Sequence, residues 1–220
     1  MAQKQNDRYI RRIHRSSLPV DTIELAKYLI GKTLVHDTRA GRTSGRIVET
    51  EAYVVGDAAG HAYRGPTPRN TSLYLDRGHA YVYRAYGLHF LVNVSSEIRG
   101  VGAGVLLRAL EPLDGIHLMR LRRPQAPLID LARGPGRLAQ AMGISLRQDG
   151  LDLCAAGQLW LGDSVRPMGE MGRSVRIGIS RETHRLLRFY EKGSRYVSGP
   201  KRAAYGSRLA QRAGFRLLSA

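Results

Sequence analysis

Two glutamates stand two positions apart in a mostly apolar run, residues 47–53, with the sequence IVETEAY. In a β-strand Glu49, Glu51 and Tyr53 face the same side. A carboxylate close to apolar and aromatic groups can serve as a general base or acid, because loss of water tunes its pKa. The alternative is an exposed strand glutamate that pairs with one of the many arginines. The local pattern does not choose between Glu49 and Glu51.

Aromatic side chains are concentrated in residues 81–90, where three tyrosines precede a histidine and a phenylalanine in the sequence YVYRAYGLHF. Bases taken out of a nucleic-acid duplex are held by stacking on such rings. Gly87 breaks the strand directly after Tyr86, and an aromatic residue at a turn tip can enter between bases. A sheet core with tyrosines at its rim is the structural alternative.

His61 and Arg108 stand in surroundings that are unusual for their types. His61 belongs to a loop rich in Gly, Pro and Arg, residues 56–69, and long loops in compact domains are commonly functional. The alternative for a lone loop histidine is an ordinary surface residue. Arg108 interrupts a run of Val and Leu, so it requires a carboxylate or a phosphate partner. Gly134 and Pro135 open a helix that could seat a phosphate or simply form a turn.

Other reaction chemistries find less support in the sequence. No His-x-Glu or paired-cysteine arrangement accompanies His61, so a zinc site of the deaminase type is not predicted. Cys154 is the only cysteine, which excludes an intrachain disulfide. Lys192 and Lys201 stand outside the candidate region, where a Schiff-base mechanism would need an amine.

The charge balance points to a polyanionic partner. The chain has 35 Lys and Arg against 18 Asp and Glu, a formal net charge of +17, while its 43% hydrophobic content suits a globular domain. Most of the basic residues are arginine, which suits bidentate phosphate contacts; GC-rich coding is the alternative cause of that bias. No apolar run of about 18 residues and no signal-peptide pattern occur. We therefore expect a cytoplasmic, nucleoid-associated protein, or a nuclear one in a eukaryote.

Strands and helices that must position these groups can be placed from periodicity, caps and turn residues. Asp21 begins a capping box that predicts a helix ending before Gly31. The pattern predicts further helices at 112–122 and 134–143, and strands at 32–37, 44–54, 80–86, 88–95, 104–110, 159–161, 175–179 and 187–190. Strands and helices without βαβ alternation favour an α+β fold: one compact domain with a mainly antiparallel curved sheet, surrounding helices and a protruding β-hairpin. We assign residues 18–200 to this domain, between a basic arm, 1–17, and a basic tail, 201–220.

The order of the motifs is more specific than any one of them. ETEAY at 49–53 is followed by His61, TPRN at 67–70, YVYRAYG at 81–87, Asn93, LLRALEP at 106–112 and GP at 134–135. This series resembles the alkyladenine (3-methyladenine) DNA glycosylase family of the mammalian type, which is distinct from the helix-hairpin-helix glycosylases. The resemblance covers residues 18–198.

The resemblance implies a monofunctional enzyme of base excision repair that bends double-stranded DNA and flips a damaged purine into a pocket. It places Glu51 as the general base that activates water for attack at the sugar C1′. Arg108 would lie near that water and the phosphate of the flipped nucleotide. No metal or organic cofactor is required, and a monomer is expected.

The resemblance also assigns the residues that hold DNA. Tyr53, His61 and Tyr83 would stack on and hydrogen-bond the flipped base, Asn93 would crowd the exocyclic amine of guanine, and Tyr86 would intercalate. The loop at 56–63 differs from the mammalian type in length and composition, so 3-methyladenine is the expected substrate, with hypoxanthine and ethenoadenine left open.

Two further classes remain open on the residues alone. A non-catalytic binder of DNA or RNA would use the tyrosines as a stacking platform. A metal-dependent nuclease would use Glu49, Glu51 and Asp57 as ligands.

Overall fold

The fold is organised around one long strand, β2 (Gly41–Tyr53), which carries both glutamates. The computed structural model describes residues 10–85, 87 and 89–199. One edge of β2 pairs with β5 (Gly104–Asp114), and the other pairs first with β1 (Thr33–Thr38) and then with β8 (Arg188–Glu191). The second half of β2 is therefore enclosed between β5 and β8.

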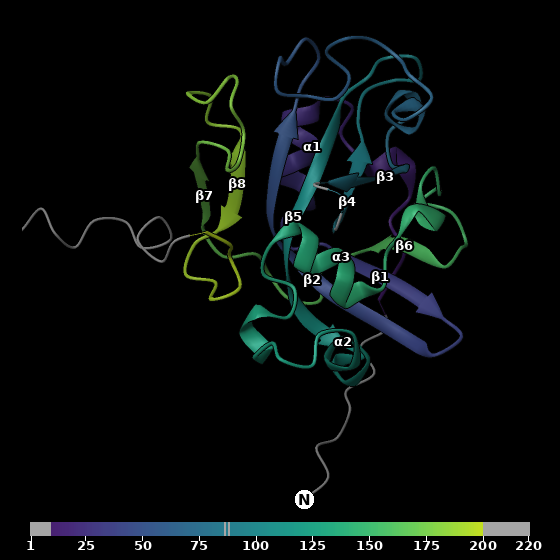
Figure 1. Cartoon of the computed structure of the whole chain (residues 1–220), viewed down its shortest axis with the longest axis vertical. Coiled ribbons are helices and arrows are strands. Elements are labelled where there is room, and N and C mark those ends of the chain that lie inside the picture. The colour runs from purple at the N-terminus through teal and green to yellow at the C-terminus, as the bar shows by residue number, and fades with distance from the viewer. Residues whose placement is uncertain (1–9, 86, 88, 200–220) are drawn as a thin grey trace, which may run out of the picture.

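The remaining strands extend this sheet on both sides. They are β3 (Ala80–Ala85), β4 (His89–Ser95), β6 (Leu159–Gly162) and β7 (Met171–Ser174). The strand order is β3-β4-β5-β2-β1-β6, with β7 paired to β8, and every pairing is antiparallel. The sheet curls into a half-barrel with β3 and β4 at one end and β6 at the other, while β7 and β8 stand beside it (Figure 1). The α+β fold predicted from the sequence is confirmed.

In the part of the chain that the structure describes, three helices pack around the sheet: α1 (Thr22–Leu29), α2 (Ile116–Arg122) and α3 (Pro135–Met142). Short 3-10 helices are present as well: η1 (Arg15–Ser17), η2 (Thr71–Tyr74), η3 (Leu128–Asp130) and η4 (Leu146–Gln148). Asp21 caps α1 as predicted, accepting hydrogen bonds from the N–H groups of Ile23 and Glu24. The carboxylate of Glu24 bonds Lys27 instead of completing the capping box. One apolar core lies between the sheet and the helices, and its fully buried members include Leu25, Leu34, Ile47, Leu107 and Leu138.

Two predicted elements are wrong in position. The helix expected from residue 112 begins only at Ile116, because β5 continues to Asp114 and Gly115 then turns the chain at φ +65°. A Cβ at Gly115 would meet the carbonyl oxygen of Arg42 at 2.1 Å, so only glycine fits this turn. The strand expected at 175–179 is irregular, and β7 lies before it. Arg176 turns inward there to a buried carboxylate, which alternation in the sequence does not reveal.

The chain ends are only partly described. From the basic arm at 1–17, residues 10–17 are visible: Arg12 bridges to Gly162, and Ile13 is buried in the core. The basic tail at 201–220 lies outside the described residues. Within the described part of the chain, no helix is long and apolar enough to cross a membrane.

Candidate active site

A cavity of about 500 Å³ opens where β2, β3, β4 and β5 meet the loop after β2. Its walls contain five of the seven residues singled out in the sequence: Tyr53, His61, Tyr83, Asn93 and Arg108. The structure thus gathers residues that are spread over more than fifty positions of the chain. Tyr86, the predicted intercalating residue, lies outside the described residues. Glu51 is not part of the cavity wall.

Glu51 lies directly behind that wall. It has no exposed surface, and its three partners all belong to residues that line the cavity. The Tyr53 hydroxyl donates to Oε2 at 3.0 Å, the Ile177 N–H donates to Oε1 at 2.7 Å, and Arg108 Nη1 lies 3.3 Å from Oε2. Burial raises the pKa of Glu51, although these donors oppose the increase. A carboxylate has about four lone-pair sites, so Glu51 retains capacity to accept a proton.

Glu49 has the opposite character. Burial opposes its ionisation, but the guanidinium groups of Arg188 and Arg108 outweigh burial and lower its pKa. Arg188 Nε donates to Oε1 at 2.7 Å and Arg108 Nε at 3.0 Å, while the Ser198 N–H and hydroxyl donate at 2.6 and 2.9 Å. With four donors around it, Glu49 is an ionised structural anchor. The tertiary structure therefore distinguishes two carboxylates that the sequence pattern left equivalent.

Arg108 connects the two carboxylates. The pairing register skips Val48 on β2 and Arg108 on β5, so a β-bulge leaves Arg108 without a direct opposite residue. Bulges of this kind re-aim a side chain beside a site. Arg108 accordingly reaches both Glu49 and Glu51 and still contributes to the cavity wall with 7% of its surface exposed. Its strand position predicted a carboxylate or a phosphate partner, and Arg108 has two carboxylate partners.

Three aromatic rings form one wall of the cavity. The rings of Tyr81 and Tyr83 stack with centroids 5.3 Å apart, and the His61 ring meets Tyr83 edge-on at 4.4 Å. His61 Nδ1 shares a hydrogen bond of 2.8 Å with the Tyr81 hydroxyl. Desolvation and the nearby charge of Arg69 lower the pKa of His61, so its ring is neutral near pH 7. A neutral imidazole can donate to or accept from a purine edge.

Asn93 lies on β4, which pairs with β3, the strand that carries Tyr81 and Tyr83. It is 6% exposed, and its amide donates to the carbonyl oxygen of Tyr81 at 3.1 Å. This bond fixes the amide at the floor between β3 and β4, where it lines the cavity.

The loop after β2 is held by two buried anchors. Arg176 pairs with Asp57, donates to the carbonyl oxygen of Ala52 at 3.0 Å, and lies 4.6 Å from the centre of the Tyr53 ring. Asn70 donates to the carbonyl oxygen of His61 at 2.9 Å. These contacts set the positions of Tyr53 and His61 in the wall.

Nothing in the sequence marked Arg176, Ile177, Arg188 or Ser198 as part of the site. All four follow β6 in the chain: Ile177 reaches Glu51, Arg188 and Ser198 reach Glu49, and Arg176 reaches Asp57, in the part of the fold where β8 pairs with β2. In a chain with so many arginines, a buried one leaves no local signal. Asp57, considered as a metal ligand, instead pairs with Arg176. Among the residues that the structure describes, no three His, Cys, Asp or Glu side chains lie close enough to hold a metal ion.

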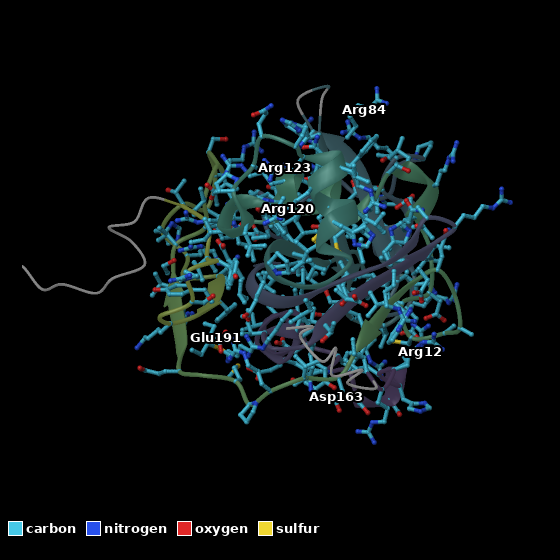
Figure 2. All side chains as sticks on the ribbon, turned by 90° about the horizontal axis from the view of Figure 1, so that it is seen from below. Arg12, Arg84, Arg120, Arg123, Asp163 and Glu191 are labelled. Carbon is cyan, nitrogen blue, oxygen red and sulfur yellow. The ribbon has the colours of Figure 1, made fainter. Side chains whose placement is uncertain are left out.

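Exposed arginines surround the mouth of the cavity. Arg69 and Arg84 line it, and Arg69 Nη2 donates to the carbonyl oxygen of Arg84 at 2.9 Å. Arg84 stands at one edge of the molecule beside the β3–β4 hairpin, while Arg12 and Asp163 lie at the other (Figure 2). An electropositive rim around a ring-lined cavity, backed by a carboxylate and an arginine, defines an enzyme that acts on a base of a nucleic acid.

Comparison with known proteins gives the family. Residues 16–195 match the family model described as methylpurine-DNA glycosylase (MPG). A relative from Mesorhizobium japonicum is 63% identical over 86% of this chain and 91% of its own length, and one from Paraburkholderia phytofirmans is 55% identical over 86% and 88%. A relative from the more distant Methanoculleus marisnigri is 47% identical over 81% of this chain and 94% of its own. Each of the three is named "Putative 3-methyladenine DNA glycosylase".

The chain belongs to the methylpurine-DNA glycosylase family. It is therefore a 3-methyladenine DNA glycosylase, an enzyme that hydrolyses N-glycosyl bonds, and its substrate is DNA.

Proposed function

We propose that Glu51 is the general base of a monofunctional glycosylase, which takes a proton from the water that attacks C1′ of a damaged purine nucleotide. The observation that carries this proposal is the position of Glu51: buried, with a raised pKa, and in contact with three groups of the cavity wall. A base works best when its pKa approaches the working pH, which burial favours here.

Arg108 has two roles in this reaction. Its guanidinium holds the carboxylate of Glu51 from one side, at 3.3 Å, and presents positive charge to the cavity on the other. That charge suits the phosphate of a flipped nucleotide. Water would be the nucleophile: the described cavity lining contains no lysine, and Lys192 pairs with Glu170 at the surface.

The aromatic wall would hold the flipped base. Tyr53 and Tyr83 present faces for stacking, and the neutral ring of His61 offers a hydrogen-bonding partner. Rings attract cationic purines such as 3-methyladenine most strongly, because the ring face carries negative charge density. Hypoxanthine and ethenoadenine, which are neutral, would rely on stacking and on hydrogen bonds such as those that His61 offers, without the attraction between a cation and the rings. Asn93, fixed at the floor, would collide with the exocyclic amine of guanine.

Tyr86 would fill the space that the flipped nucleotide leaves in the duplex. Tyr86 lies outside the described residues, but in the sequence it directly follows Ala85, the last residue of β3, and Ala85 lines the cavity. Insertion of an aromatic wedge bends DNA and stabilises the flipped state. The enzyme would act as a monomer in base excision repair, in the cytoplasm at the bacterial nucleoid, or in the nucleus if its source is eukaryotic.

Release of bases from a methylated duplex tests the proposal. The protein is incubated with methylated DNA in the presence of a chelator, free 3-methyladenine is quantified, and strands are examined before and after alkali. Duplexes with hypoxanthine or ethenoadenine extend the test to neutral bases. The expected result is base release in chelator, with strand breaks only after alkali. Breaks that need metal would favour a nuclease, and binding without release would favour a non-catalytic module.

Substitution of the base completes the test. Glu51→Gln should bind the lesion duplex and release base about 10²–10⁴-fold more slowly, the usual contribution of a general base. Glu24→Gln, which removes an exposed carboxylate on α1, is the control and should keep the wild-type rate. Wild-type turnover by Glu51→Gln would refute the assignment.

A further inference from the structure

The described residues contain two clusters of buried ion pairs on the sheet, and only one of them reaches the cavity. In the first, Glu191 pairs with Arg46, which is fully buried, and with Arg166 near the surface. None of these residues lines the cavity. In the second, Glu49 holds Arg188 and Arg108, and Arg108 forms part of the cavity wall.

We propose that Glu49 is a positioning residue for catalysis, which holds Arg108 by its Nε so that Nη1 alone meets Glu51. This inference rests on the proposed role of Glu51 as the base. Its geometric support is the division of one guanidinium between two carboxylates, at 3.0 Å to Glu49 and 3.3 Å to Glu51.

Glu49 is itself held too firmly to follow Arg108. Arg188 and the Ser198 hydroxyl also donate to its Oε1, and the Ser198 N–H donates to its Oε2. Arg188 is fixed in turn by Ser174 on β7, at 2.9 Å, and by the carbonyl oxygen of Ser198, at 2.9 Å. The position of Arg108 is therefore determined by β7, β8 and the segment after β8.

The division has an electrostatic consequence. An arginine that faced Glu51 alone could pair with it through two nitrogens, and the carboxylate would become a weaker base. Glu49 prevents this by taking the Nε, and its negative charge adjoins Glu51 on the same face of β2. The charged and titratable groups that face Glu51 are Glu49 and Tyr53 on β2 and Arg108 on β5, with the Ile177 N–H as the remaining donor. Glu49 thus preserves the basicity of Glu51.

The test is the pH dependence of single-turnover release of 3-methyladenine from methylated duplex DNA. Glu49→Gln removes the negative charge beside Arg108 and Glu51, although its amide oxygen can still accept from Arg108 Nε. Arg108 then interacts more strongly with Glu51, so the acid limb of the profile should move to lower pH by about one unit. The plateau rate should fall roughly tenfold or more, because the base is weaker and Arg108 is misplaced. Glu191→Gln is the matched control, and its acid limb and plateau should equal those of the wild type.

A second variant separates charge from position. Glu49→Asp keeps the charge but cannot span both Arg108 and Ser198, so its acid limb should stay in place while its plateau falls. It also provides the measurement if Glu49→Gln does not fold: a wild-type plateau in Glu49→Asp would overturn the proposal. An unshifted limb and a plateau within twofold of wild type in folded Glu49→Gln would do the same.

Glu51→Gln in the same assay distinguishes failure of the proposed role of Glu49 from failure of the proposed role of Glu51 as the base. Loss of activity in Glu51→Gln together with wild-type behaviour of Glu49→Gln would reject only the role of Glu49. Wild-type activity of Glu51→Gln would reject the proposed base, and the positioning role with it.

Discussion

Removal of the Tyr53 hydroxyl is the simplest test of what sets the pKa of Glu51. It donates to Glu51 Oε2 at 3.0 Å, whereas the ring itself lines the cavity and lies against Arg176. Tyr53→Phe removes the donor and keeps the ring. Because the donor stabilises the ionised carboxylate, its loss should raise the pKa of Glu51 further.

The size of the shift follows from the hydrogen bond. A bond to a charged group contributes about 1.5–3 kcal/mol, and one pKa unit corresponds to about 1.36 kcal/mol. The protonated carboxyl also accepts a hydrogen bond, so only part of this energy distinguishes the two protonation states. We therefore expect the pKa of Glu51 to rise by about one unit.

Single-turnover release of 3-methyladenine from methylated duplex DNA, measured between pH 5 and 9, reads out this pKa. The acid limb reports the ionisation of the base, so in Tyr53→Phe it should move to higher pH by about one unit. This direction is opposite to that expected for Glu49→Gln. Lesion-duplex affinity should stay close to wild type, because the stacking ring remains.

Tyr81→Phe is the matched control. It also loses a buried hydroxyl, but that hydroxyl contacts His61 rather than Glu51. Its acid limb should stay in place. An unmoved limb in Tyr53→Phe, or an equal shift in Tyr81→Phe, would refute the coupling between the Tyr53 hydroxyl and the base.

Three further predictions concern stability and DNA binding. Asp57→Asn should destabilise the protein by about 3–5 kcal/mol in urea unfolding, because it leaves Arg176 buried without its counter-charge, whereas loss of the exposed Glu24 should cost under about 1 kcal/mol. The pKa of Glu49 is lowered in the folded state, so its ion pairs stabilise the protein fully above about pH 4.3. That contribution is lost as the pH falls through the folded-state pKa, so the difference in unfolding free energy between wild type and Glu49→Gln should shrink over this range. A difference that stays constant with pH would contradict the lowered pKa. Arg84→Ala at the cavity mouth should weaken binding to undamaged duplex and reduce the slope of the logarithm of the binding constant against the logarithm of salt concentration by about one. Substitution of Arg12, at the opposite edge of the molecule, should leave that slope unchanged. Equal slopes in both variants would place the phosphate contacts elsewhere.

The site was predictable from the sequence where its members are close in the chain. Glu51 and Tyr53 share a strand face because side chains alternate, and the structure joins them by a hydrogen bond. The apolar surroundings of Arg108 predicted a carboxylate or a phosphate partner, and both candidate carboxylates proved to be its partners. The ordered motifs then supplied the family, which the comparisons confirmed.

Partners that are distant in the chain were not predictable. The Ile177 N–H reaches Glu51 across 126 positions, and the Ser198 N–H reaches Glu49 across 149. Neither residue differs in type from an ordinary loop residue, so only the pairing of β8 with β2 reveals its role. The same applies to Arg176, whose inward turn replaced the strand predicted at 175–179.

By itself the sequence determined the α+β class, the capped helix at Asp21, the basic character of the protein and the small set of residues that could do chemistry. These properties depend on composition, local periodicity and capping, which act within a few residues of the chain. Only the tertiary structure gave the two glutamates, which the local pattern leaves equivalent, different surroundings that favour Glu51 over Glu49 as the proposed base. That choice depends on burial and on the positions of Arg108, Arg188 and Ser198, because the pKa of a carboxylate is set by the charges and donors that the fold brings to it.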